Sequence, residues 1–147
     1  MTYTCSIEID LPIDKVVGLW TDESHFQDWQ DGFKSIELIY GKKHEVGSKS
    51  KLVFEGKRQI ELVETILISN LPQEKKAIYE HKYMINTQRT LFQSINEHKT
   101  RFISEVNYIK FNGLFIKIIA KLFPSKFKAQ SQKWMEQFKY FTENLEK

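Results

Sequence analysis

The hydrophobic pattern of the first 32 residues changes from a period of two to helical spacing. Residues 3–9 alternate β-forming and polar side chains, which predicts a strand that ends before Pro12. The next segment has one apolar face at helical spacing, formed by Ile13, Val16, Val17 and Trp20. Phe26 and Trp29 lie three residues apart, which predicts a second short helix that Gly32 closes. The chain therefore begins with a strand followed by two short helices.

From residue 33 to residue 111 the period is close to two, which is typical of strands with one buried face. Polar residues and glycines separate the alternating segments, and a longer loop containing Pro72 is predicted at residues 70–76. Six further strands are predicted, over residues 33–40, 48–55, 58–69, 77–85, 87–96 and 101–111.

After Gly113 the pattern is helical to the end of the chain, with an interruption at Pro124. The last segment carries one apolar stripe, formed by Phe127, Trp134, Phe138, Phe141 and Leu145. Because this is the one long amphipathic segment, it is the element expected to cover the apolar side of the sheet. The pattern predicts a single α+β domain over residues 1–147, in which a curved seven-stranded antiparallel sheet wraps around the C-terminal helix.

Three stretches of the sequence carry a resemblance to a known family. They are SIEIDLPIDKVVGLWTDESHFQDWQDGFKSIE near the start, EVGSKSKLVF in the middle, and FNGLFIKIIAKLFPSKFKAQSQKWMEQFKYFTENLE at the end. Together they resemble the START-like, or SRPBCC, superfamily and its helix-grip fold, also called Bet v 1-like. The chain looks most like small bacterial members of the polyketide cyclase/dehydrase type. The resemblance implies a cavity between sheet and helix that accepts apolar small molecules, and the shared motifs are structural rather than catalytic.

Composition excludes several kinds of partner and bound group. The net charge of +3 is too small for a general nucleic-acid binder, although residues 101–147 hold nine Lys or Arg against four Asp or Glu. A single cysteine, Cys5, excludes an intramolecular disulfide and a cysteine-based zinc site. The four histidines have no metal-ligand spacing, so no metal and no cofactor is expected. The start of the chain lacks a signal-peptide pattern, and no apolar run is long enough to span a bilayer, so a cytoplasmic location is expected.

The polar candidates are residues that the alternation places on an apolar face. His81 shares a predicted face with Tyr79 and Tyr83, where a neutral imidazole could bond a ligand; alternatively this face is the outer one, or His81 bonds a neighbour. Glu64 falls in register with apolar residues and is a weak candidate acid or base, unless a β-bulge turns it outward. Arg89 could hold a ligand carboxylate, but a solvated position is expected.

The apolar candidates are residues expected near the middle of the groove between sheet and helix. Whether these side chains fill the groove or line a void stays open at this point. Trp20 and Trp29 are expected to anchor the two short helices, and His25 to lie at the surface. The residues predicted to bind a ligand are Phe26, Leu52, Phe54, Tyr79, His81, Tyr83, Phe92, Tyr108, Trp134 and Phe138.

The expected function is binding or transport of a hydrophobic small molecule that is lipid-, polyketide- or aromatic-like. An enzyme of the cyclase or dehydratase type is the first alternative, although no recognisable catalytic motif is present. The second alternative is a lipid-surface or protein-interaction module that uses the basic segment 110–128. For that segment we expect a helix docked on the core with its lysines in solvent, rather than a lid or an interfacial helix. Oligomeric state is not predicted.

Overall fold

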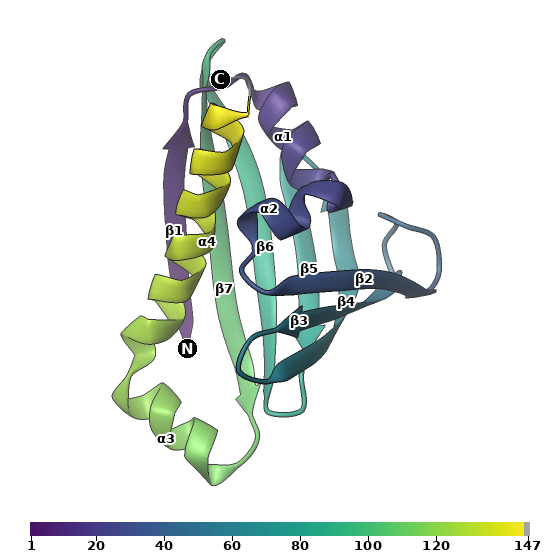
Figure 1. The fold of residues 1–147 in the computed structure, drawn as a ribbon, viewed down its shortest axis with the longest axis vertical. Helices are drawn as coiled ribbons and strands as arrows, with labels where there is room; N and C mark the ends of the chain where they lie inside the picture. The colour runs from purple at the N-terminus through teal and green to yellow at the C-terminus, as the bar shows by residue number, and fades with distance from the viewer. Residues whose placement is uncertain (146–147) are drawn as a thin grey trace.

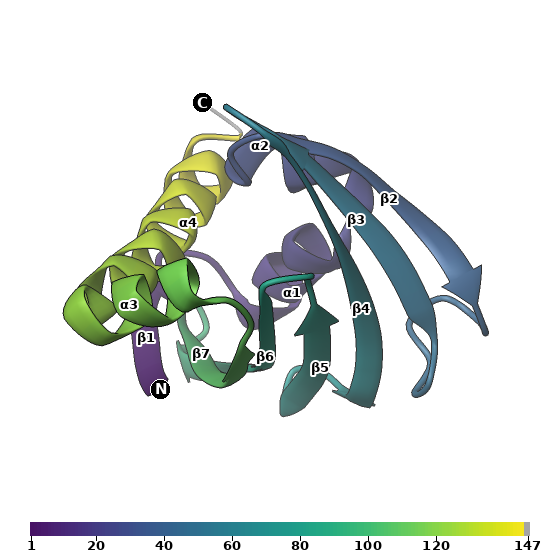
Figure 2. The ribbon, with the colours of Figure 1, turned by 90° about the horizontal axis from the view of Figure 1, so that it is seen from below.

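The seven predicted strands form one antiparallel sheet. The computed structural model describes residues 1–145, and the strand order is β1-β7-β6-β5-β4-β3-β2, with each strand beside its sequence neighbour except β1, which closes against β7. The strands are β1 (Thr2–Ile9), β2 (Phe33–Tyr40), β3 (Lys49–Glu55), β4 (Gln59–Asn70), β5 (Glu74–Glu80), β6 (Met84–Asn96) and β7 (Lys99–Phe111). Figures 1 and 2 show that the sheet curves strongly, with α4 lying along β1. The predicted fold class is confirmed.

The helices also follow the predicted order. Two short helices come after β1, and the break at Pro124 separates the last two helices of the chain. Pro124 lies in the first turn of the final helix, where its missing N–H is tolerated. The helices are α1 (Ile13–Thr21), the 3-10 turn η1 (Glu23–His25), α2 (Phe26–Trp29), α3 (Leu114–Leu122) and α4 (Pro124–Asn144). Within residues 1–145, none of these helices is long and apolar enough to cross a membrane.

The structure corrects the predicted bounds of β5. The strand was expected over residues 77–85, but it runs over Glu74–Glu80 and is followed by a tight turn at residues 81–83. The turn is closed by two backbone hydrogen bonds between His81 and Met84. Aromatic residues happen to continue the alternation through this turn, so the pattern alone did not reveal it. Pro72, in turn, made residues 70–76 look like a loop, whereas the loop covers residues 71–73 only.

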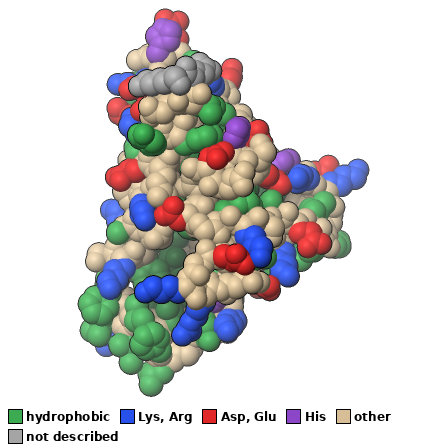
Figure 3. Space-filling model, viewed as in Figure 1, with side chains coloured by type: hydrophobic (Ala, Val, Ile, Leu, Met, Phe, Trp, Pro, Cys, Tyr) green, Lys and Arg blue, Asp and Glu red, His purple; other side chains and the backbone are tan. Residues whose placement is uncertain are grey.

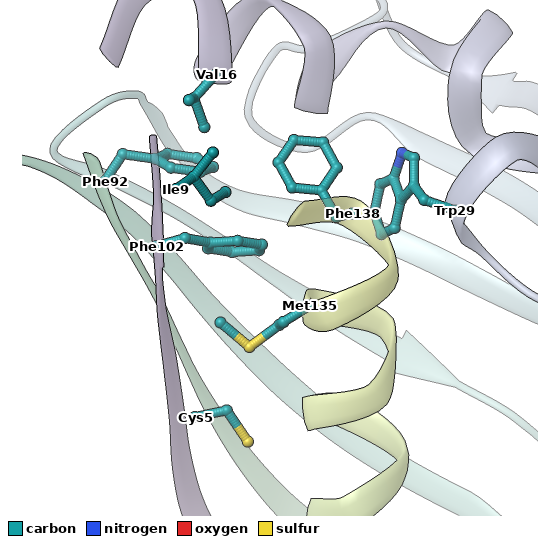
Figure 4. Close-up of a cluster of buried hydrophobic side chains, with 8 residues drawn as sticks. All are labelled: Cys5, Ile9, Val16, Trp29, Phe92, Phe102, Met135 and Phe138. Atoms are coloured by element: carbon teal, nitrogen blue, oxygen red, sulfur yellow. The ribbon is translucent and has the colours of Figure 1, made fainter. Parts of the chain in front are cut away.

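A closed core occupies one end of the sheet. Figure 4 shows side chains from β1, β6 and β7 meeting side chains from α1, α2 and α4. Phe138 of α4 is fully buried, and its ring lies 5.1 Å from that of Trp29 and 5.7 Å from that of Phe102, both at steep angles. Such edge-to-face contacts add to the burial of the rings. The core residues are Cys5, Ile9, Val16, Trp29, Phe92, Phe102, Met135 and Phe138.

The two tryptophans of the short helices lie where they were expected to act as anchors. Trp29 is buried in the core, and Trp20 packs edge-on against Phe92 at 5.6 Å between ring centroids. His25 lies partly exposed on the outside, between Asp22 and Asp28. The apolar stripe of α4 faces the sheet from Phe127 to Phe141, but Leu145 is exposed because it follows the last residue of the helix.

The expectation that residues 114–122 dock on the core is wrong. No residue of α3 is buried, and its contacts are chiefly with α4. Leu114 and Phe115 have 77% and 78% of their surface exposed. The helix extends beyond the end of the sheet (Figure 1), so the sheet offers no surface on which its apolar face could pack.

Candidate functional site

The part of the concave face that the core does not fill encloses a large cavity. Its volume is about 1220 Å³, and it lies between strands β2 to β7 on one side and the helices on the other. Exposed residues at its edges, such as Arg58 and Lys126, show that it opens to the surface. Much of the wall is apolar, including Ile36, Leu52, Phe54, Ile60, Leu62 and Ile66. The side chains of the groove therefore line a void and do not fill it.

A row of aromatic rings joins the two sides of this cavity. Phe54 of β3 stacks on Trp134 of α4, with ring centroids 5.9 Å apart and planes 13° from parallel. Phe33 continues the row to Phe26 of α2, through edge-on contacts at 5.8 and 5.5 Å. The row holds β3 and α2 to the helix across the groove, and it gives this wall of the cavity flat, rigid, apolar surfaces.

Strands β4 and β5 turn a cluster of polar side chains toward the cavity. Glu64 and Tyr79 are directly opposite each other in the antiparallel pairing, and the Tyr79 hydroxyl donates a hydrogen bond of 2.6 Å to Oε2 of Glu64. The Lys75 ammonium lies 3.6 Å from the same oxygen and 5.2 Å above the ring of Trp20. All four side chains line the cavity, and we refer to Glu64, Lys75 and Tyr79 as the polar cluster.

The protonation of Tyr79 follows from its surroundings. Burial raises the pKa of the Tyr79 hydroxyl well above its usual value, and the nearby negative charge of Glu64 and the hydrogen bond to it raise this pKa further. Tyr79 is therefore a neutral donor throughout the physiological range. Among the described residues, Oε1 of Glu64 accepts no hydrogen bond, so the cluster keeps an acceptor for a further partner. Lys75 supplies N–H donors beside it.

The wall formed by β6 and β7 is more polar than the wall formed by β3 and β4. The alternation of β6 turns Asn86, Gln88 and Thr90 toward the cavity, and β7 adds Ser104 and Tyr108. Burial raises the pKa of the Tyr108 hydroxyl, and the neighbouring Tyr3 raises it further. The cavity thus combines an aromatic wall with a wall of neutral hydrogen-bonding groups.

Seven of the ten residues predicted to bind a ligand line this cavity, namely Phe26, Leu52, Phe54, Tyr79, His81, Tyr108 and Trp134. The structure corrects the expectation that the other three line it. Phe92 and Phe138 belong to the closed core, and Tyr83 lies in the turn after β5, where 45% of its surface is exposed. Ligand binding by the seven lining residues stays a prediction.

His81 was predicted to share a strand face with Tyr79 and Tyr83, but it lies outside the strand. It lies in the turn at the end of β5, and its Nδ1 accepts a hydrogen bond of 3.2 Å from the backbone N–H of Tyr83. Burial lowers the pKa of the imidazole, and the adjacent Lys82 lowers it further, so the ring is neutral at pH 7. The alternative in which His81 bonds a neighbouring residue is therefore the correct one, and the neighbour is Tyr83.

Glu64 points inward, and the pairing of β3 with β4 continues regularly past it, opposite Ser50. The alternative in which a bulge turns it outward is wrong. Arg89 forms ion pairs with Glu74 and Glu105 and does not line the cavity, as expected for a solvated position. Within residues 1–145, no three His, Cys, Asp or Glu side chains are grouped so that they could hold a metal ion.

Sequence reasoning missed two residues beside Glu64. Lys75 was assigned to a loop, and Trp20 was treated only as an anchor, yet both line the cavity. A signal for Lys75 was present, because it lies at even spacing from Ala77 and Tyr79 and therefore on the same face of β5. Pro72 hid this signal, because the residues that follow it were taken as part of a loop over residues 70–76.

Comparison with known proteins supports the fold and goes no further. No protein-family profile matches the sequence, and no curated protein matches it significantly. Among solved structures, the Zhui aromatase/cyclase from Streptomyces sp. R1128 has a TM-score of 0.80 at 7% identity, over 100% of this chain and 96% of that one. A conserved protein from Geobacillus kaustophilus has a TM-score of 0.77 at 14% identity, over 97% and 95% of the two chains.

A third similar structure is norcoclaurine synthase from Thalictrum flavum, with a TM-score of 0.67 at 13% identity, over 98% of this chain and 87% of that one. These likenesses, together with the sheet order and the long C-terminal helix, define the fold class of the chain. The chain has the helix-grip fold of START-like and Bet v 1-like proteins, as the sequence resemblance implied.

Proposed function

We propose that this protein binds a hydrophobic small molecule with one polar end in the cavity between the sheet and α4. The observation that carries the proposal is a cavity of about 1220 Å³ with an aromatic wall and a buried cluster of Glu64, Lys75 and Tyr79. Ligand sites are typically concave, mostly apolar, and contain a few polar groups that fix orientation. The similar structures include an aromatase/cyclase and norcoclaurine synthase, which supports a ligand of this general kind.

The affinity would come mainly from burial of apolar ligand surface. Each square ångström removed from water contributes roughly 25 cal/mol before the costs of ordering the ligand. Phe54, Trp134 and Leu62 offer the flat and aliphatic surfaces for that contact. This contribution favours a lipid-, polyketide- or aromatic-like body over a small polar metabolite.

The polar cluster would orient the ligand. Glu64 can accept a hydrogen bond through Oε1, and Lys75 can donate one, so a hydroxyl or carbonyl group fits beside them. A charged end group is less suitable, because Glu64 and Lys75 already balance each other at 3.6 Å. The preferred ligand is therefore amphipathic but uncharged at its inner end.

The test of the proposal is to fill the cavity and measure binding of Nile red, an uncharged apolar dye. Leu62→Trp places a bulky ring in the cavity, whereas the control Leu67→Trp places the same ring on an exposed position of the same strand. We expect Leu62→Trp to weaken dye binding by at least about tenfold, equivalent to about 1.4 kcal/mol. Equal affinity in the two variants would mean that the dye binds elsewhere and would contradict the proposal.

Orientation by the polar cluster is tested with naphthalene and 2-naphthol, which differ by one hydroxyl group. We expect the protein to prefer 2-naphthol by about 2- to 10-fold, the range of one net hydrogen bond. Lys75→Met should remove most of that preference and leave naphthalene binding unchanged, while Lys76→Met on the neighbouring position of β5 should preserve the preference. An unchanged preference in Lys75→Met would assign the hydroxyl to another wall of the cavity.

A second candidate function is acid-base catalysis on the bound molecule, of the cyclase or dehydratase type. The polar cluster favours it, because a carboxylate, an ammonium and a neutral phenol lie together inside an apolar cavity. An enzyme would show turnover that Glu64→Gln abolishes while Nile red still binds. If Glu64→Gln alters neither turnover nor its pH profile, catalysis through this cluster is excluded.

A further inference from the structure

Helix α3 exposes an apolar face that no other part of the described chain buries. We call it the α3 patch, and it consists of Leu114, Phe115, Ile118, Leu122 and Phe123, with exposed fractions of 77%, 78%, 45%, 63% and 48%. Figure 3 shows hydrophobic side chains gathered at the lower end of the molecule, beside several Lys and Arg side chains. Contiguous exposed patches of this kind usually mark an interaction surface.

The helical spacing separates the patch from a basic stripe. Leu114, Ile118 and Leu122 are four residues apart and form one line along α3. Lys117 and Lys121 form the adjacent line, and both are exposed. An apolar face bordered by lysines is the pattern of helices that lie in a membrane interface, because lysine can bury its methylene stem and keep its ammonium near the headgroups.

The charge of the surrounding chain has one sign. Residues 106–135 contain six lysines and no Asp or Glu. Lys133 pairs with Asp31, and the Lys126 ammonium lies over the ring of Phe123. Within the described part of the chain, five of the six make no ion pair, namely Lys110, Lys117, Lys121, Lys126 and Lys128. The patch is therefore surrounded by uncompensated positive charge.

We propose that the α3 patch docks on the surface of a bilayer that contains anionic lipid. The apolar side chains would enter the headgroup–acyl boundary, and the lysines would meet anionic headgroups, each adding about 1 kcal/mol near such a surface. Charge favours this occupant over a second copy of this chain. A two-fold contact pairs a surface with itself, so it would bring the same lysines together.

The position of α3 links this surface to the cavity. Ile119 of α3 and Lys126 at the start of α4 both line the cavity, so the cavity reaches the surface beside the α3 patch. At the same end, the backbone N–H of Asn112 donates to the carbonyl of Tyr83, which holds the turn after β5 next to the start of α3. A membrane bound to α3 would therefore lie next to one opening of the cavity. Docking itself does not depend on what the cavity binds.

The test is co-sedimentation of the full chain with vesicles. Vesicles of phosphatidylcholine alone are compared with vesicles that contain 30% phosphatidylglycerol, at about 50 and 500 mM salt. We expect binding to the anionic vesicles at low salt, and much weaker binding at high salt or without anionic lipid. No binding to anionic vesicles at low salt would overturn the proposal.

Two matched pairs of variants assign the binding to α3. Phe115→Glu is compared with Tyr140→Glu, an equally exposed aromatic position on α4, and Lys121→Glu is compared with Lys42→Glu in the β2–β3 turn. Each α3 variant should lower vesicle binding by at least about fivefold, the effect of one lysine near an anionic surface, and each control should leave it unchanged. Equal losses in variant and control would overturn the assignment.

Light scattering during gel filtration tests whether the α3 patch instead joins two copies of the chain. If the unmodified chain is a dimer that Phe115→Glu converts to a monomer, the α3 patch is a contact between copies and the membrane proposal is wrong. A monomer that retains its vesicle binding supports docking by a single chain.

Discussion

At the scale of single residues, the contact between Tyr79 and Glu64 sets the chemistry of the cavity. The two residues are cross-strand partners, and the hydroxyl donates to the carboxylate at 2.6 Å. Burial and the charge of Glu64 both oppose ionisation of the phenol, so the pKa of Tyr79 is raised. The free energy of unfolding should therefore depend on pH through this contact, and this dependence can be measured without any ligand.

The first prediction concerns alkaline pH. Because the pKa of Tyr79 is higher in the folded state than in the unfolded state, its contribution to stability is present below about pH 10 and lost as the pH rises above that value. We expect the free energy of unfolding, measured with urea, to fall between pH 9.5 and 11. The fall should be smaller in Tyr79→Phe, while Tyr140→Phe should keep it. An identical fall in Tyr79→Phe would show that the phenol is not held neutral by burial.

A second prediction separates the core from the cavity. Phe138 is fully buried among other core side chains, so Phe138→Ala should lower the free energy of unfolding by about 3–5 kcal/mol. Phe115→Ala removes the same ring from an exposed position of α3 and should change it by less than about 0.5 kcal/mol. Urea unfolding measures both. Similar losses would mean that α3 packs against the protein in solution.

At the scale of elements, Gly32 fixes how α2 leads into β2. Its φ is +76°, and a Cβ there would lie 2.3 Å from the carbonyl oxygen of Glu55 on the neighbouring strand. The backbone N–H of Glu55 also donates to the carbonyl of Gly32 at 2.7 Å, so the two segments cannot separate easily. The short helices are thereby held to the edge of the sheet beside the cavity.

The matching prediction uses two glycines. Gly32→Ala should destabilise the fold by more than about 1 kcal/mol, because both the positive φ and the close backbone oppose a side chain. Gly18→Ala lies within α1 with open space around it, so it should stabilise the fold by about 0.5–1 kcal/mol through helix propensity. Thermal unfolding of both variants gives the comparison. A neutral Gly32→Ala would show that the α2–β2 connection is not rigid.

The order and type of the elements could be predicted from sequence, because alternation and helical spacing report which side of an element is apolar. The strand over residues 33–40 was predicted with the bounds it has in the structure. The docking of α3 could not be predicted in the same way. Its apolar face is evident from the spacing of Leu114, Ile118 and Leu122, but the pattern does not say whether another element covers that face.

At the scale of the whole molecule, the cavity depends on distances that no local pattern encodes. The curvature of the sheet and the Phe54–Trp134 stack set how far β3 lies from α4, and the core fills only one end of the groove. For this reason the inward side of β3 and β4 was predictable, while the separation of Phe92 and Phe138 from the lining residues was not. The core residues and the cavity-lining residues are equally apolar, so the sequence pattern does not distinguish them.

Native mass spectrometry of protein purified without denaturation tests whether the cavity holds a hydrophobic molecule. We expect the unmodified chain and Leu67→Trp to carry a discrete additional mass that organic solvent extracts, and Leu62→Trp, whose cavity is partly filled, to lack it. The same additional mass on all three proteins, or none on the unmodified chain after incubation with excess Nile red, would show that the cavity does not bind a hydrophobic molecule.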